Sequence, residues 1–449
     1  MMRLTTLLMG VVAIVGVMAL PAEMPEPGEL ATLLGEEEFE DYLDKWIEYE
    51  QAKFGNDTAV LQARSGCQIR VNGDLGQPQP VYIHNGNYPV PQGNTGVIHL
   101  NTGEAITVSC VGNGRTIVHP QIAASVVTAT ATCVSGALVS GAGWLNGNGA
   151  FGGLTCTAHA FHDAEYTNER CFNNFQVIRV GFYVNNVFYP KYWSCFDPNR
   201  LEVLYVWYEQ NEEHAVHQTG VDRPSWLAGS FFPGVGINAL YTQVQQKAKI
   251  AEYVGAELAD KYVTSTQFLA RGHLTAKSDM IFATGQRSTF YFINAAPQWQ
   301  PFNAGNWNWL EQNLRARIGE AGYHTTIYTG TWGVSQLRNQ AGQLVDIFLH
   351  HDANNNAQLP VPLYFYKVVY DASRRQGTAF VSINNPHYTE AEVRALTFCT
   401  DRCRNNAAFD WLRWQPDRID IGYSFCCDVD DFRRTVPHLP AFTVTGLLA

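Results

Sequence analysis

The most distinctive hydrophobic pattern of the chain lies at residues 267–318, where two short apolar runs precede a helical repeat. Residues 267–274 predict a strand, and residues 289–293 predict a second one that is apolar throughout, as in a buried strand. Residues 304–318 predict a helix whose buried stripe is Trp307, Leu310, Leu314 and Ile318. The expected local order is therefore strand, strand, helix.

Residues 62–200 have a different pattern, in which short alternating runs are separated by Gly, Asn and Thr. Asn185 and Asn186 tolerate positive φ, so we expect a hairpin between residues 175–183 and 187–196. Further strands are predicted at 106–111 and 125–134. This region predicts a β-rich domain.

The remaining pattern predicts a second domain at residues 201–449. It predicts strands at 201–208, 363–370 and 379–383, and helices at 238–258, 390–398 and 409–414. Thr389 and Glu392 have the spacing of a capping box at the start of the second helix.

The first residues have the composition of a signal peptide. Arg3 precedes an apolar run, 4–20, that is too short to favour spanning a bilayer, and Val17-Met18-Ala19 suits cleavage, so residues 1–19 are expected to be removed. No later apolar run reaches about 18 residues, the length that a membrane span needs. We expect a secreted, extracellular protein with no membrane contact.

Cysteine usage agrees with an oxidising compartment. Six of the ten cysteines precede residue 196 and four follow residue 398. We expect disulfides within each group. The vicinal Cys426 and Cys427 are expected to reach different partners.

The net charge of −11 is unfavourable for binding a polyanion, but most of this charge is concentrated in one segment. Residues 23–50 hold eleven Asp and Glu against Lys45 alone, so the rest of the chain is nearly neutral. Residues 20–61 are either a solvated acidic extension or a pro-segment that covers the active site. A near-neutral body can still bind phosphate where a few arginines converge, although it excludes long electrostatic tracking along nucleic acid.

Three histidine motifs outside the central stretch could hold a metal, but surface histidines near a turn, a polar loop and an exposed loop, respectively, are the expected interpretations. They are His159/His162 with Asp163, His214/His217, and His350-His351-Asp352.

The central stretch carries the side chains that phosphodiester hydrolysis needs. His273 can accept a proton from water near neutral pH. Asn303 offers a carbonyl oxygen to Mg²⁺, which keeps much of its hydration shell, and Glu311 can orient those waters. Arg271 and Arg315 can bind phosphate.

The order of these residues resembles that of the DNA/RNA non-specific endonucleases, also called ββα-metal or His-Me finger nucleases, and in particular secreted arthropod digestive nucleases that prefer duplexes. The matching motifs are Ala270-Arg271-Gly272-His273, Asn294 to Gln298, Asn303 to Trp307, and Leu310-Glu311 with Arg315. The resemblance covers about residues 201–439. It implies that His273 is the proton acceptor, Asn303 the direct metal ligand and Asn294 a polar support.

This sequence departs from the family pattern at Ala270, where many members have aspartate. The family also has an upstream phosphate-binding arginine, for which Arg223 is a candidate.

Together these observations predict an α+β protein: a mixed-sheet nuclease domain with a ββα-metal site, preceded by a β-rich disulfide-bonded domain. The expected function is Mg²⁺-dependent endonucleolytic cleavage of DNA, RNA or both, with Mn²⁺ or Ca²⁺ as substitute or structural ions. No protein partner is implied. The alternatives are a catalytically inactive nucleic-acid-binding protein on the same scaffold and a phosphodiesterase for small nucleotides.

Overall fold

The computed structural model describes residues 66–141, 143–145 and 147–449, together with Met24, Leu30, Tyr42, Lys45, Trp46 and Tyr49. The predicted signal peptide and most of the acidic segment lie outside the described residues. Within the described part of the chain, no helix is long and apolar enough to cross a membrane.

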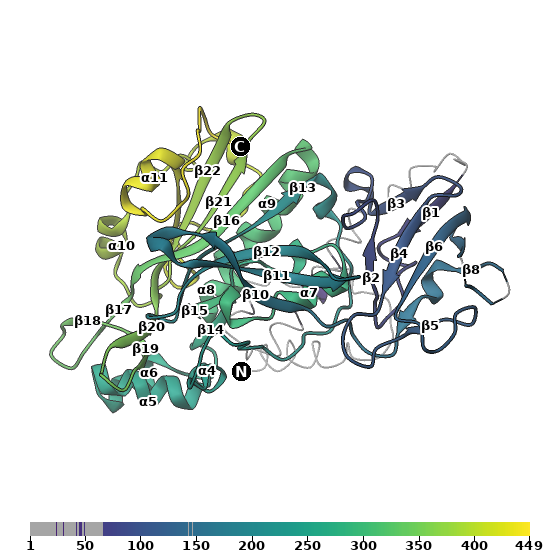
Figure 1. Ribbon diagram of the computed structural model, residues 1–449. Helices are drawn as coiled ribbons and strands as arrows, with labels where there is room; N and C mark the ends of the chain where they lie inside the picture. The colour runs from purple at the N-terminus through teal and green to yellow at the C-terminus, as the bar shows by residue number, and fades with distance from the viewer. Residues whose placement is uncertain are drawn as a thin grey trace, which may run out of the picture.

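An eight-stranded antiparallel sheet forms the main body, in the order β10-β11-β12-β13-β16-β21-β22-β23 (Figure 1). The strands are β10 (Asp163–Arg170), β11 (Gln176–Val184), β12 (Val187–Asp197), β13 (Glu202–Asn211), β16 (His324–Val334), β21 (Pro362–Asp371), β22 (Gln376–Ile383) and β23 (Ser424–Asp428). Both faces of its central strands are buried. On β21, Phe365 packs into one core and its neighbours Tyr364 and Tyr366 pack into the other, as the two-residue period of a strand requires.

Helices cover both faces of this sheet. One core includes α5 (Gln243–Val254) and α9 (Asn308–Ala321), and the other includes α10 (Glu390–Leu396) and α11 (Val429–Thr435). Two short ribbons complete the body: β17 (Gln336–Arg338) with β18 (Leu344–Asp346), and β19 (Phe348–His351) with β20 (Ala357–Pro360). The predicted α+β class with an extended sheet is confirmed.

The boundary expected at residue 200 falls inside this sheet and needs correction. Strands β10, β11 and β12 precede that residue, yet β12 pairs directly with β13, with Trp193 opposite Trp207. Alternation alone predicts a strand without saying which sheet it joins, and this is why the boundary was misplaced. The predicted hairpin is confirmed, with φ of 50° at Asn185 and 63° at Asn186.

The described residues from 66 to the start of β10 form a smaller β-rich domain beside the main body (Figure 1). Its strands are β1 (Cys67–Arg70), β2 (Val81–Ile83), β3 (Val97–Leu100), β4 (Ala105–Ser109), β5 (Ile117–Val118), β6 (Thr128–Ser135), β7 (Leu138–Ser140), β8 (Gly149–Ala150) and β9 (Thr155–Cys156). A separate hydrophobic core and two disulfides, Cys67–Cys133 and Cys110–Cys156, hold it together.

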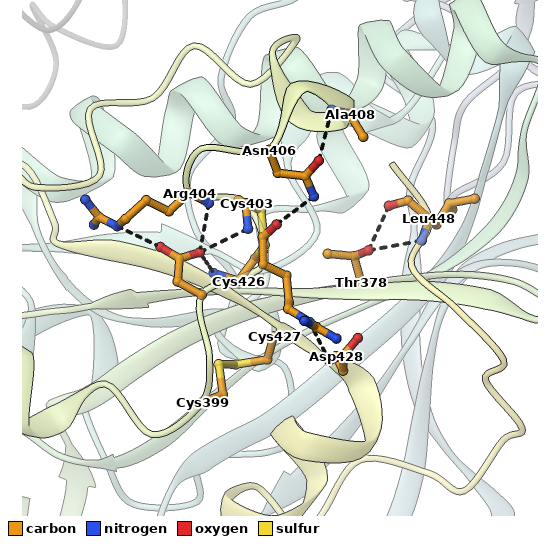
Figure 2. The surroundings of a disulfide bond; sticks show 12 residues. Thr378, Cys399, Cys403, Arg404, Asn406, Ala408, Cys426, Cys427, Asp428 and Leu448 are labelled. Atoms are coloured by element: carbon orange, nitrogen blue, oxygen red, sulfur yellow. Dashed lines mark hydrogen bonds and ion pairs between the residues drawn. A yellow bond between two sulfur atoms is a disulfide. The ribbon is translucent and has the colours of Figure 1, made fainter.

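The other three disulfides lie in the main body, and none joins the two cysteine groups. Cys171 pairs with Cys195, and the neighbours Cys426 and Cys427 on β23 reach Cys403 and Cys399 (Figure 2). The predicted grouping and the divergent vicinal pair are both confirmed. Asp401, Cys403 and Cys426 form the one group of metal-ligand atom types within the described residues, but these cysteines are oxidised, so they offer no thiolate.

Two helix predictions need correction. Residues 238–258 form three helices, α4 (Ile237–Leu240), α5 and α6 (Ala256–Tyr262), because Thr242 caps α5 and Gly255, at φ 91°, ends it. Residues 409–414 form turns after a 3₁₀ segment that ends at Phe409. Tertiary packing of Trp411 and Trp414 on Phe380 overrides the local helical tendency there. The capping box before α10 is confirmed.

Candidate active site

The site begins with two antiparallel strands, β14 (Leu269–His273) and β15 (Ala295–Trp299). The first prediction is confirmed, with a strand shorter than expected. The second was placed too early, since a 3₁₀ turn (Phe292–Asn294) precedes the strand. Pro297 lies within this strand, which belongs to a two-stranded ribbon, where a missing N–H is tolerated.

A helix follows directly, so the strand-strand-helix order is confirmed. A short segment, α8 (Gln300–Phe302), leads into a π-helical turn (Asn303–Trp307) and then into α9. A Cβ at Gly305 would lie 2.6 Å from the Cβ of Ile421, so this close approach requires glycine. The Asn306 side chain fixes the turn by donating to the Gly422 carbonyl at 2.6 Å. A π-turn of this kind is common at functional sites, and here it sets the position of Asn303.

His273 lies at the end of β14 against aromatic rings. Its ring centroid is 4.5 Å from Trp226 and 4.8 Å from Phe290. Burial lowers the pKa of His273 well below its usual value, and the charges of Arg223 and Lys277 lower it further. Its Nε2 is buried and has no hydrogen-bond partner among the described residues. At neutral pH the imidazole is therefore uncharged and can accept a proton.

A buried ionic network lies behind the helix. Asp279 accepts hydrogen bonds from Arg315 at 2.7 Å, Tyr208 at 2.6 Å and Gln210 at 2.8 Å, while the Lys367 ammonium lies 3.9 Å away. Burial alone would raise the pKa of Asp279, but Lys367 and Arg315 hold it below its usual value. Arg315 is only 4% exposed. Its position in this network is thus fixed by a carboxylate of the chain itself.

Glu311 lies one helical turn before Arg315 on α9 and faces the same buried region. Burial raises the pKa of Glu311 to about 7, and the nearby Asp279 charge acts in the same direction. One of its carboxylate oxygens, Oε1, is buried and accepts no hydrogen bond from a described residue. Such an atom needs a ligand, a water or a cation for compensation.

Asn294 closes the loop that joins the two strands. Its side-chain oxygen accepts from the Thr275 N–H at 2.8 Å, and its amide donates to the carbonyls of Thr275 and Thr289 at 3.0 and 2.8 Å. Both amide hydrogens are used, so Asn294 is a positioning residue.

Arg271 and Arg223 lie on either side of this arrangement. The Arg271 guanidinium donates to the side-chain oxygen of Asn238 at 3.0 Å and lies 5.6 Å from the Tyr241 ring centre. Arg223 lies 6.0 Å from the Phe290 ring centre, close enough for its charge to act on His273. The structure thus brings the candidate upstream arginine to the histidine.

The available donor atoms fit a hydrated divalent cation. The Asn303 side chain is partly exposed, and its oxygen accepts no hydrogen bond from a described residue, while its nitrogen donates to Gln300 at 3.4 Å. Together with the unpaired Glu311 oxygen, this is an oxygen-only donor set of the kind that Mg²⁺ prefers.

The histidine motifs do not form a second metal site among residues 66–449 as described. His162 and His217 are buried, at 8% and 4% exposure, so the surface position expected for His162 is wrong. Apolar surroundings bury them: His162 packs between Phe182 and Tyr291.

Several residues of the site could not be predicted from the sequence. Tyr208 and Trp226 lie outside the central stretch, Asp279 lies in the loop between β14 and β15, and no motif marks any of the three. Lys367 could have been noticed in the sequence, because it is the one positive charge within the largely apolar strand β21, whose other charge, Asp371, is its last residue. A lone lysine at such a position must find a buried partner.

Comparison with known proteins identifies the class to which this strand-strand-helix site belongs. The model of the DNA/RNA non-specific endonuclease family matches residues 173–432. The chain therefore belongs to this family and is a nuclease whose class depends on divalent metal ions and acts on nucleic acids.

Individual relatives agree with that assignment. The chain is 26% identical to a salivary endonuclease of Lutzomyia longipalpis over 79% of each chain. It is 25% identical to salivary protein Tsal2A of Glossina morsitans morsitans, over 66% of this chain and 73% of the relative. A chain from a crystal structure of the EndoG/EndoGI complex covers 57% of this chain at 18% identity and a TM-score of 0.35, which adds no argument.

Proposed function

We propose that the protein is a secreted, Mg²⁺-dependent endonuclease that hydrolyses DNA, RNA or both and prefers duplexes. The observation that carries the proposal is a strand-strand-helix motif in which the strand ends at His273, whose buried Nε2 has no partner among the described residues, and the helix carries Glu311, whose buried Oε1 also has none. Salivary relatives support secretion, as do five disulfides in the described chain.

In this mechanism His273 accepts a proton from the attacking water. Its apolar surroundings keep the imidazole neutral before reaction, so the base is ready at physiological pH. External water requires no 2′-hydroxyl, so both sugars are chemically acceptable.

Asn303 would hold the cation directly, and Glu311 would orient its water molecules. A bound divalent cation would supply positive charge to the scissile phosphate and the leaving oxygen. The unpaired Glu311 oxygen supports this role, since a water molecule bound to the cation could donate a hydrogen bond to it.

The arginines divide into two groups. Arg271 and Arg223 are partly exposed near His273 and would bind the substrate phosphate. Arg315 is held by Asp279, so its charge would stabilise the site from behind Glu311. The sequence predicted that Arg315 binds phosphate. In this proposal Arg315 is mainly a positioning residue.

The acidic segment 20–61 would act as a pro-segment. Tyr42, Trp46 and Tyr49 are buried, and Trp46 packs edge-on against Trp309 of α9 at 5.6 Å. This contact places Trp46 beside the site helix. A comparison of cleavage by the full mature chain and by a form that begins at residue 58 tests this role. Equal cleavage by the two forms at low salt would favour the alternative, a solvated acidic extension.

Incubation of purified protein with double- and single-stranded DNA and RNA, with and without a chelator, tests the proposed function. We expect cleavage that the chelator abolishes and added Mg²⁺ restores. Binding without cleavage would favour the inactive binding protein. Hydrolysis of dinucleotides alone would favour the small-nucleotide phosphodiesterase.

A further inference from the structure

The smaller β-rich domain contacts the loop between the two site strands. The Phe282 ring of this loop packs on Tyr82 of that domain at 6.1 Å. The Thr284 N–H donates to the Gln79 side chain at 3.1 Å. The loop therefore links the active site to a domain that hydrolysis itself does not use.

Continuous packing leads from His273 to the surface of the smaller domain. Trp226, which contacts His273, belongs to a segment that pairs with residues near Phe290: the Leu227 N–H donates to the Phe290 carbonyl at 2.9 Å. One residue further, the Tyr291 hydroxyl donates to the His162 carbonyl at 3.0 Å. The His162 ring in turn stacks on Phe161 at 6.0 Å.

Two arginines line this path, and neither is neutralised by an ion pair within the described chain. Arg287, on α7 (Ala283–Ser288), donates to the Asp222 backbone carbonyl at 3.1 Å. Arg115 donates through Nε to the His159 backbone carbonyl at 2.6 Å. Each guanidinium is thus oriented by a neutral carbonyl and keeps its charge and further N–H donors for another partner.

An exposed aromatic ring completes this surface. Phe161 is 44% exposed, and the Arg115 guanidinium lies 5.8 Å from its ring centre. The two positive charges reach the same place, because both Arg287 and Arg115 act on the pKa values of His159 and His162. Asp222 and the partly buried Asp163 are the negative groups nearby.

We propose that Arg115, Arg287 and Phe161 form a secondary binding surface for the nucleic-acid strand that leaves the active site. This inference rests on the proposed nuclease function. The two guanidiniums would bind successive backbone phosphates, and the Phe161 ring would pack against a sugar or an unpaired base. Arg287 of this surface donates to the carbonyl of Asp222, the residue before Arg223, so the surface adjoins a proposed phosphate-binding arginine and its occupant is the continuation of the substrate.

Such a surface has a measurable consequence, because it adds phosphate contacts only to substrates long enough to reach it. Each lost phosphate contact should reduce the slope of log affinity against log salt by about 0.9 for duplex DNA. Affinity for a long duplex should fall more than affinity for a short oligonucleotide.

The experiment measures binding in the His273→Ala background, which keeps the substrate intact. Arg115→Gln and Arg287→Gln are compared with Arg170→Gln as a matched control. Arg170 is exposed and also donates to a backbone carbonyl, that of Asn174 at 3.4 Å, but it lies at the opposite end of β10 from His162. Circular dichroism confirms that each variant is folded.

We expect a smaller salt slope and a lower long-to-short affinity ratio for both variants of the surface, and no change for Arg170→Gln. Phe161→Ala should weaken binding of single strands more than binding of duplexes. Salt slopes and long-to-short affinity ratios equal to those of Arg170→Gln would contradict the proposed binding surface. If the otherwise unmodified enzyme cleaves nucleic acid, that result leaves the proposed function intact, whereas failure to cleave or bind any nucleic acid would contradict both.

Discussion

The surroundings of His273 and the buried network of Asp279 and Arg315 differ in their electrostatics. His273 lies among aromatic rings, and its buried Nε2 has no partner within the described residues. Behind the helix, Arg315 and Asp279 are buried, and Asp279 accepts short hydrogen bonds from Arg315, Tyr208 and Gln210. The first region keeps a base neutral and available, while the second holds charges in fixed positions.

This difference shows how to separate chemistry from support in a buried site. A polar atom left unbonded in the interior is costly, so its retention points to a ligand or a reaction. A polar atom with all its bonds satisfied, as in Asn294, serves the local structure. Substitutions in the two regions should therefore affect different measurements.

The largest effect is expected for His273→Ala. A positioned general base contributes roughly 10²–10⁴-fold, so kcat/KM should fall by that factor while the protein stays folded. His350→Ala, on the β19–β20 ribbon away from the site, is the control. A variant that kept more than about a tenth of the rate would remove His273 from the role of base.

Asp279→Asn should act on stability first. It removes the carboxylate that compensates Arg315 and Lys367, and breaking a buried pair costs about 3–5 kcal/mol of unfolding free energy. Asp74→Asn provides the matched control, because its partner Arg70 is 64% exposed and such a pair contributes about 0–1 kcal/mol. Equal losses in denaturant unfolding would show that the network is not the charged support described here.

Asn303→Ala and Glu311→Ala should change the dependence of rate on magnesium. Loss of a residue that orients metal-bound water weakens metal affinity by about 10–100-fold, so the half-saturating concentration should rise for Glu311→Ala. A larger rise is expected for Asn303→Ala, the direct ligand. An unchanged magnesium curve for Asn303→Ala would contradict that assignment.

The strand-strand-helix order around the candidate site was easier to predict from the sequence than the surrounding sheet, for a physical reason. The helical stripe from Trp307 to Ile318 and the order of His273, Asn303 and Glu311 are local patterns, and both lie in one stretch of chain. The position of the second strand was harder to predict, because this strand contains Pro297. A strand tolerates a proline only where it lies at a sheet edge or in a similar position. That fact is absent from local sequence.

Contacts between residues far apart in the sequence could not be predicted from local patterns. Asp279 meets Tyr208 and Lys367 only because β13, β16 and β21 are neighbours in the sheet. Strands 163–197 alternate like those of the smaller domain, so periodicity could not assign them to the larger sheet.

A smaller effect concerns the titration of His273. Burial and the charges of Arg223 and Lys277 lower its pKa, so the neutral form should persist well below pH 6.5. Because protonation favours the unfolded chain, His273 contributes stability that is present above its unfolded pKa and is lost as pH falls towards the folded value. Nuclear magnetic resonance of the ring, assigned by its absence in His273→Ala, gives the midpoint.

Arg223→Gln should raise that midpoint towards the ordinary value, because it removes one of the two charges. A midpoint at or above pH 6.5 in the unmodified protein would contradict the claim that its surroundings keep His273 neutral.

The central claim is that the imidazole of His273 is the base, and chemical rescue tests it most directly. His273→Gly leaves a space walled by Trp226 and Phe290, which free imidazole can enter. We predict that added imidazole restores cleavage in proportion to its concentration and to its neutral fraction, and that Asn303→Ala shows no such recovery. No recovery of His273→Gly, or equal recovery of Asn303→Ala, would contradict the account.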